Sequence, residues 1–183
     1  MAHSESSKTS TASDFFNVVD TPMSATDSHA SLSSATLPPY DITIASVPVP
    51  KETYMIRNID TGRAITVEEG HLTLKLPGGT RGGWHWHCVE RDGGWLGFRE
   101  AVSGKYLGRD GMGGFQVKFN HFVDWESFCL RPLEEGGYHL LVLEESNNRY
   151  SSSYLHRMGI SDDGELVMVN TAAEATRWEF VKV

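Results

Sequence analysis

The feature that most constrains this chain is a pattern that occurs three times between residue 53 and the last residue, 183. Each copy opens with an aromatic residue and a short apolar segment, at residues 54–56, 95–98 and 138–141. A repeat at a spacing of about 40 residues is typical of folds that build one small unit several times, because a single unit cannot bury its own apolar face. We therefore expect one domain made of three similar units.

Two further landmarks recur in each unit. One is a turn followed by a basic residue, which is Arg63 in the first unit, Lys105 in the second and, in a weaker copy, Arg149 in the third. The other is a closing segment, which begins in the three units at Trp84, Trp125 and Trp178. Between the two landmarks lies a segment typical of a short strand, at residues 72–76, 115–119 and 166–169. The first two alternate strictly between apolar and polar residues, as half-buried strands do.

Each unit thus contains about four short strands, and no segment shows the sustained period of an amphipathic helix. Three units are too few for a β-propeller, which needs at least about four blades. Three units of four strands instead predict an all-β fold, the β-trefoil, in which a barrel is closed by three hairpins. We place the three pseudo-repeats at about residues 53–92, 93–135 and 136–183.

The pseudo-threefold axis of such a fold brings equivalent side chains of the three units into one core. The residues that we expect there are Trp84, Trp125, Trp178, Phe128, Phe180, Cys88 and Cys129. The two Cys take equivalent positions in the first two units, and we interpret them as buried free thiols that act as small apolar residues. A redox switch is the alternative.

Residues 1–52 differ in composition from the rest of the chain. All 18 Gly lie after residue 60, whereas Ser, Thr and most of the seven Pro crowd into residues 1–52. Such a segment cannot bury enough apolar surface to offset the entropy lost on ordering, so we predict a disordered N-terminal tail. Its apolar segment at residues 15–19 is either a docking segment or chance hydrophobicity in a linker.

The net charge of −8 argues against several classes of partner. We expect no nucleic-acid partner, because phosphate binding needs a basic face, and no attachment to anionic lipid by charge. No apolar run is long enough to span a bilayer. With two Cys and no secretory signal peptide, we expect a cytoplasmic location and reduced thiols.

Three segments carry a family resemblance: Ser103–Gly108, Trp125–Phe128 and Trp178–Phe180. They are similar to segments of the fascin-like, actin-crosslinking β-trefoils, in which a Gly-Lys-Tyr-Leu strand recurs and a Trp-Glu-x-Phe strand closes the repeat. The domain also resembles single-domain fungal proteins of that superfamily. The resemblance implies a protein partner, actin, and a single trefoil implies binding rather than bundling of filaments.

We therefore predict a non-catalytic binding module with a protein partner. An intracellular carbohydrate-binding, lectin-like module is the alternative, although the Gln-x-Trp signature of ricin-B lectins is absent from all three units. The candidate binding residues are Arg63, Lys105 and Arg149. Equivalent turns should place them on one rim, where they would contact an acidic protein surface or an anionic glycan.

Catalysis and metal binding have less support in the sequence. His85 and His87 share one face of the expected strand, and two His at this spacing can reach one Zn²⁺. A third ligand would have to be His71 or His121, and we interpret the pair as a polar strand face that adds to the candidate binding residues, with no metal and no cofactor. Adjacent carboxylates, such as those at 162–163, are interpreted as solvated turns rather than a catalytic pair, so we do not expect an enzyme.

Overall fold

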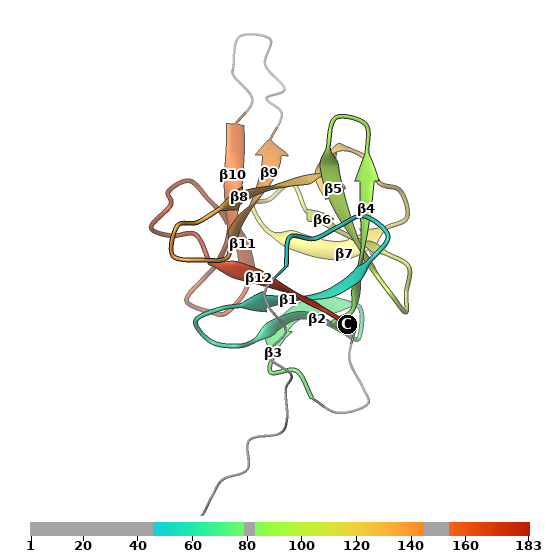
Figure 1. The fold of residues 1–183 in the computed structure, drawn as a ribbon, viewed down its shortest axis with the longest axis horizontal. Helices are drawn as coiled ribbons and strands as arrows, with labels where there is room; N and C mark the ends of the chain where they lie inside the picture. Colours follow the sequence, from blue (N-terminus) through green and yellow to red (C-terminus); the bar gives the residue numbers. More distant parts are fainter. Residues whose placement is uncertain (1–45, 79–82, 145–153) are drawn as a thin grey trace, which may run out of the picture. The chain divides into compact units, whose positions relative to one another are not determined.

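A sheet of 12 strands makes up most of the described part of the chain (Figure 1). The computed structural model describes residues 46–78, 83–144 and 154–183. The predicted tail up to residue 45 and Arg149 lie outside the described residues. Within these residues, no helix is long and apolar enough to cross a membrane.

Each repeat contributes four strands. The first repeat contains β1 (Thr53–Asn58), β2 (Ala64–Glu68), β3 (His71–Lys75) and β4 (Trp86–Arg91). The second contains β5 (Trp95–Glu100), β6 (Tyr106–Arg109), β7 (Phe115–Phe119), the 3-10 helix η1 (Asp124–Glu126) and β8 (Phe128–Pro132). The third contains β9 (Tyr138–Glu144), β10 (Tyr154–Ile160), β11 (Leu166–Val169) and β12 (Trp178–Lys182).

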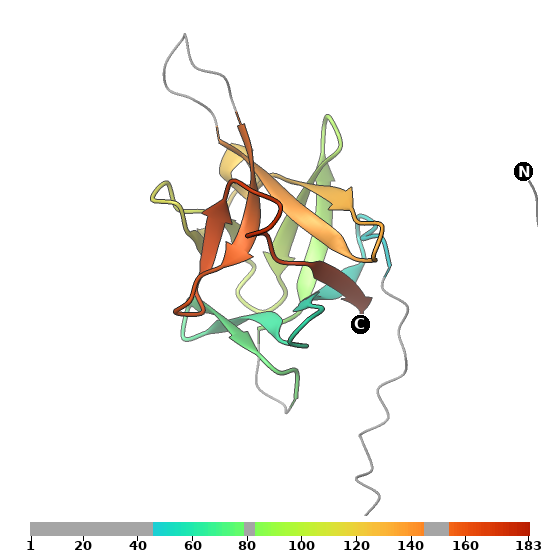
Figure 2. The same cartoon turned by 90° about the vertical axis from the view of Figure 1, so that its left-hand side faces the viewer.

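The first and last strands of the three repeats close into a ring. Strand β1 pairs with β4, β4 with β5, β5 with β8, β8 with β9, β9 with β12, and β12 with β1 again. The remaining strands form the hairpins β2–β3, β6–β7 and β10–β11. The predicted β-trefoil is therefore confirmed. Seen from the side, the β10–β11 turn comes down beside the β2–β3 hairpin (Figure 2).

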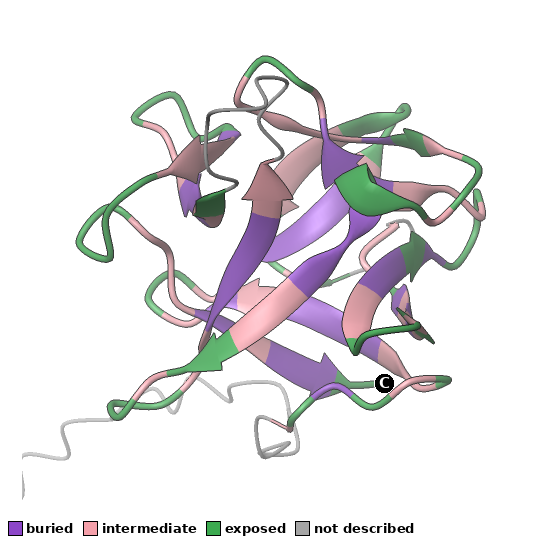
Figure 3. Ribbon diagram, turned by 90° about the horizontal axis from the view of Figure 1, so that it is seen from above, coloured by how far each residue is buried: buried purple, intermediate pink, exposed green. Residues whose placement is uncertain are grey.

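The buried residues of the strands, coloured purple in Figure 3, come from all three repeats and form the core of the barrel. The strand registers group them in threes, and three of these sets have no exposed surface: Ile56, Phe98 and Leu140; Ile65, Leu107 and Met158; Trp86, Phe128 and Trp178. Phe98 stacks on Phe180 with ring centroids 5.4 Å apart. Burial of this apolar surface is the main contribution to the stability of the fold.

The sequence placed two tryptophans in the core that the structure places nearer the surface. Trp125 is 40% exposed and lies in η1, before β8 begins, and Trp84 is half-buried. The true equivalents of Trp178 are Trp86 and Phe128, because each makes the bridge between the first and last strand of its repeat. The shared Trp does not mark equivalent positions, because β4 begins two residues after Trp84 and β8 begins three residues after Trp125.

The same correction separates the two cysteines. Cys88 is fully buried on β4, whereas Cys129 is half-buried on β8 and stands at the position that His87 has in the first repeat. The residue of the second repeat that corresponds to Cys88 is Leu130. The two thiols are therefore not equivalent by the pseudo-threefold axis.

Residues 46–52, at the end of the segment that the sequence assigned to the tail, run along the barrel. The backbone N–H of Ser46 donates to the carbonyl of Phe180 at 3.1 Å, and that of Val49 donates to the hydroxyl of Tyr54 at 2.9 Å. Cys88 exchanges backbone hydrogen bonds of 2.8 Å with this segment. Pro48 is buried.

Candidate binding site

The turns that place Arg63 and Lys105 have the same hydrogen-bond pattern. Asn58 Oδ1 accepts bonds of 2.7 and 3.1 Å from the backbone N–H groups two and three residues ahead of it. Glu100 does the same in the second repeat, with bonds of 2.9 and 2.5 Å to its two carboxylate oxygens. A Gly with positive φ, 69° in one repeat and 68° in the other, precedes each basic residue. The predicted equivalence of these two positions therefore holds in detail.

The third repeat departs from this pattern. Its capping position is Val142, whose side chain cannot accept a hydrogen bond. The register of β9 with β10 makes His156, rather than Arg149, the residue that corresponds to Arg63 and Lys105. His156 Nε2 lies 2.7 Å from Glu144 Oε2. The position equivalent to Arg63 and Lys105 is therefore held by His156, and Arg149 itself lies outside the described residues.

The two remaining basic side chains differ in what they contact. Lys105 Nζ donates a hydrogen bond to Asn120 Oδ1 within its own repeat. The guanidinium of Arg63 makes no ion pair and no hydrogen bond with any residue that the structure describes. Of these two described side chains, Arg63 is therefore the one that is available to a ligand.

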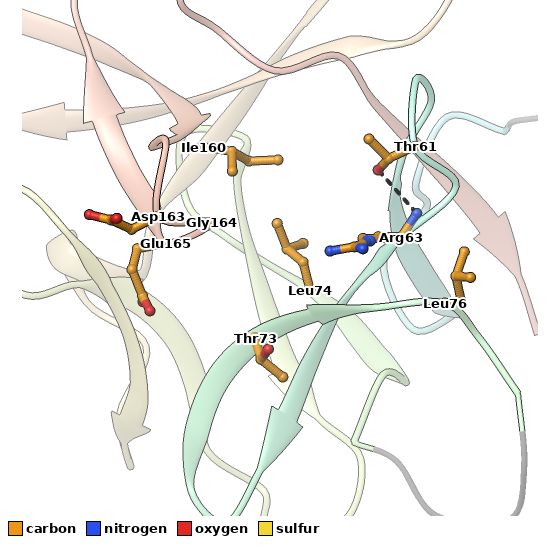
Figure 4. Close-up of a pocket in the computed structure, with 9 residues that line it drawn as sticks. All are labelled: Thr61, Arg63, Thr73, Leu74, Leu76, Ile160, Asp163, Gly164 and Glu165. Carbon is orange, nitrogen blue, oxygen red and sulfur yellow. Dashed lines mark hydrogen bonds between the residues drawn. The ribbon is translucent and has the colours of Figure 1, made fainter.

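Arg63 lies in a hollow of about 530 Å³ between the first and third repeats (Figure 4). We call this hollow the Arg63 groove. Its lining residues are Thr61, Arg63, Thr73, Leu74, Leu76, Ile160, Asp163, Gly164 and Glu165. In Figure 4 the Arg63 guanidinium extends into the space between the walls, while Asp163 and Glu165 stand on the opposite wall.

Regular local structure fixes both walls. Leu74 pairs with the buried Ile65 between β2 and β3, so it packs at the edge of the core, and its remaining surface lines the groove beside Arg63. On the other wall, the turn after β10 is closed by a 2.9 Å bond from the Ser161 N–H to the Glu165 carbonyl. Gly164 has a φ of 83°, a conformation that suits Gly because it has no Cβ.

The groove offers three kinds of contact. Arg63 supplies hydrogen-bond donors on one wall, and the exposed carboxylates of Asp163 and Glu165 supply acceptors on the other. Leu74 and Ile160 give an apolar surface between them. Such a site suits a ligand that has an apolar face and several hydroxyl groups at its edge.

The groove is open because the pseudo-threefold arrangement is broken elsewhere. At the boundary between the third and second repeats, the N–H of Met168 donates to the carbonyl of Gly113 at 2.7 Å, and Gly114 bridges to Val167. The hairpins there meet backbone to backbone. Between the β2–β3 and β10–β11 hairpins no such backbone bond joins the described residues, which leaves room for side chains.

The two strand histidines do not gather a metal site. His85 is exposed, and His87 is half-buried with Nδ1 at 3.4 Å from the Thr53 hydroxyl. Both alternative third ligands, His71 and His121, are exposed. Nowhere in the described part of the chain do three or more His, Cys, Asp or Glu side chains come together as a metal site.

Both thiols are held in their protonated form. Burial, followed by the charge of Glu90, raises the pKa of Cys88 to about 12. Burial also raises the pKa of Cys129. Because the thiolate is the reactive species, this environment favours the reading of inert thiols over that of a redox switch.

Sequence reasoning missed the acidic wall of the groove. Asp163 and Glu165 lie in an exposed turn, as the sequence predicts for residues 162–163, and they line the groove on the wall opposite Arg63, although they belong to another repeat. The sequence does contain a signal for the hairpin turn that carries them, because Gly164 and Gly70 occupy equivalent turns, with φ of 83° and 84°. What brings this turn to Arg63 is the closure of the barrel, which a linear pattern does not contain.

Comparison with known proteins establishes the fold and no family. No family model matches the chain, and no curated protein matches it. A designed threefold-symmetric protein, ThreeFoil, aligns with a TM-score of 0.56 and 17% identity over 72% of this chain and 99% of its own. A ricin B-like lectin from Macrolepiota procera, described in complex with lactose, aligns with a TM-score of 0.54 and 17% identity over 75% of this chain and 100% of its own.

A larger protein also contains a similar domain. An endo-β-galactosidase from Clostridium perfringens that releases GlcNAcα1-4Gal aligns with a TM-score of 0.57 and 18% identity over 72% of this chain. The match covers 32% of the galactosidase, so this chain corresponds to about a third of it. At these identities the comparisons support the β-trefoil fold alone, and the fascin-like family does not follow from them.

Proposed function

We propose that this chain is a non-catalytic binding module that takes a saccharide in the Arg63 groove. The observation that carries the proposal is a guanidinium, unpaired among the described residues, that lies across an apolar surface from a wall with two acidic residues, Asp163 and Glu165. A sugar ring presents C–H groups on its faces and hydroxyl groups around its edge. Carboxylates accept from such hydroxyls, a guanidinium donates to them, and aliphatic side chains pack on the C–H faces.

The arrangement suits binding better than hydrolysis. A glycosidase needs two carboxyl groups on either side of the bond that is cleaved. Here both acidic residues, Asp163 and Glu165, belong to one wall, and the residue on the other wall is Arg63 rather than a second carboxylic acid. The similarity in fold to a lactose-bound lectin adds support for a saccharide ligand.

The actin reading has less support from this structure. The residues behind the fascin-like resemblance are mostly used inside the domain. Tyr106 stacks on Phe122 with centroids 5.7 Å apart, Leu107 and Phe128 are fully buried, and Lys105 bonds to Asn120. These residues therefore present little free surface to a filament.

The test is a screen of the full chain against immobilised neutral oligosaccharides, including lactose, followed by titration of the best ligand. Arg63→Ala and Glu165→Gln should each weaken binding by about tenfold, the usual effect of losing a hydrogen bond to a charged group. Lys105→Ala is the matched control, because Lys105 follows the equivalent turn but does not line the groove.

Three results would decide against the proposal. Saccharide binding that is unchanged in both groove variants would place the ligand elsewhere. Co-sedimentation with filamentous actin, lost in Lys105→Ala and retained in Arg63→Ala, would instead support a protein partner. Release of reducing sugar from the bound oligosaccharide would show that the module is catalytic.

A further inference from the structure

Arg109, the last residue of β6, is a charged residue at an apolar position. The hairpin registers give Val67 and Ile160 as its equivalents in the other two repeats. Arg109 is only 6% exposed, and its Nε is enclosed with no hydrogen-bond partner in the part of the chain that the structure describes. A buried cation without an anion is costly, so an unpaired one in a native structure calls for an explanation.

The neighbour of Arg109 is an exposed aromatic ring. Its guanidinium carbon lies 4.6 Å from the centre of the Trp125 indole, a cation–π geometry. Trp125 stands three residues before Phe128, where the other repeats have the small residues Gly83 and Ala175 before Trp86 and Trp178. The second repeat therefore replaces an aliphatic residue and a small one by Arg and Trp at adjoining positions.

The carboxylates next to these residues in the sequence do not neutralise Arg109. Asp110 Oδ1 accepts backbone bonds of 2.7 and 2.9 Å within its own turn. Asp124 pairs with Arg91 at 2.6 Å. Glu126 accepts a 2.9 Å bond from the Val123 N–H, and none of the three bonds to Arg109. Among the described residues, Arg109 has no ion pair and no hydrogen bond.

The turn that follows Arg109 lies against the Trp125 indole. Gly111 has a φ of 79°, and a Cβ there would lie 3.1 Å from the Trp125 ring. The turn thus packs closely against one part of the indole, while 40% of Trp125 stays exposed. An aromatic surface next to an unpaired guanidinium combines a platform for a ring with donors for an anion.

We propose that Arg109 and Trp125 form a second ligand site, which takes an acidic saccharide. The ligand carboxylate accepts hydrogen bonds from the terminal nitrogens of Arg109, and its sugar ring lies on the exposed part of the Trp125 indole. Arg suits this role because its planar guanidinium matches a carboxylate in geometry. The proposal rests on the proposed function, since it takes the chain to be a saccharide-binding module, and it assigns the acidic ligand to a site outside the Arg63 groove.

The experiment compares two matched probes, a tetrasaccharide of galacturonic acid and its methyl ester, by calorimetric titration of the full chain. We expect the affinity for the acid to exceed that for the ester by about tenfold or more, because only the acid offers a charged acceptor. Addition of the acid should also shift the NMR signal of the Trp125 indole N–H. The ester, which lacks the charge, should leave that signal in place.

Two variants separate this site from the groove. Arg109→Ile introduces the residue that the third repeat has at this position, so the fold should tolerate it, and it should abolish the preference for the acid. Its melting temperature should rise, because an unpaired buried charge is removed. Arg63→Ala should weaken binding of the ester and leave the shift of the Trp125 signal by the acid unchanged.

The outcomes distinguish the two proposals. A preference for the acid that survives in Arg109→Ile would overturn the second site and leave Arg109 as a residue that only supports Trp125. Equal binding of acid and ester by the unchanged protein would also overturn it, while keeping the proposed function. Failure of both probes and of every neutral saccharide to bind would overturn both.

Discussion

Replacing individual tryptophans by phenylalanine tests how the three repeats superimpose. Trp86 and Trp178 are fully buried, and each donates its Nε1–H to a backbone carbonyl of its own repeat, at 2.9 Å for Trp86 and 3.4 Å for Trp178. The equivalent residue of the second repeat is already Phe128. Trp86→Phe and Trp178→Phe therefore introduce the residue that the second repeat has at this position, but not the residues that surround Phe128 there.

The magnitude follows from two terms. Trp86→Phe leaves the carbonyl of Ile65 without its donor, at a cost of about 1–3 kcal/mol. The smaller ring leaves part of the indole volume empty, which costs about 1–2 kcal/mol in a core that relaxes incompletely. We expect a loss of about 2–5 kcal/mol for Trp86→Phe, and about 1 kcal/mol less for Trp178→Phe because its bond is long.

Trp84→Phe and Trp125→Phe are the matched controls. Neither side chain is fully buried, so each change should cost no more than about 1 kcal/mol. The assay is urea unfolding followed by far-UV circular dichroism, because tryptophan fluorescence changes with the substitution itself. A loss for Trp84→Phe or Trp125→Phe as large as that for Trp86→Phe would refute the register argued here.

Three further predictions concern Glu126 and Gly104 in the second repeat and the thiol of Cys88. Burial is the main cause that raises the pKa of Glu126, so folding favours the neutral form of this carboxyl group. The stability that the neutral form gives is lost as the pH rises above the ordinary carboxyl range. Glu126→Gln should therefore raise the melting temperature at pH 7 and have little effect at pH 4. Cys88, with a pKa of about 12, should react with a thiol reagent at pH 8 only when the protein unfolds, as quenched labelling and mass spectrometry would show. Gly104→Ala should cost about 1 kcal/mol or more in urea unfolding because Gly104 has a φ of 68°, whereas Gly78→Ala, in open space, should not.

The fold was accessible from the sequence because its turns repeat in chemistry as well as in spacing. Asn58 and Glu100 cap their turns through the same backbone groups, and both turns end in a Gly with positive φ. Such turns require particular residue types, so the pattern can be read directly. The core demands only apolar volume, which is why Trp86, Phe128 and Trp178 are equivalent in space but not in identity.

The candidate site was less accessible because it depends on contacts between repeats. Arg63 was found from its turn, but its opposing residues, Asp163 and Glu165, come from the far end of the chain. The third basic residue was misplaced for a related reason: the β9–β10 connection is longer than its counterparts, so His156 rather than Arg149 reaches the equivalent position. Spacing along the chain carries no information about which hairpin sides will meet.

Departures from threefold equivalence identify the residues that packing does not explain. Where core packing decides which residue fits, all three repeats have an apolar residue. Ile65, Leu107 and Met158, which have no exposed surface, are one such set. At the position of Arg109 the two other repeats show that an aliphatic residue fits, so the charge is not needed for the fold. The same comparison sets the expectation for a merely structural residue: its replacement by the residue of a sister repeat should leave every ligand measurement unchanged. Arg109→Ile is therefore expected to stabilise the fold. If the more stable protein loses its preference for the acid, a weakened structure cannot be the cause.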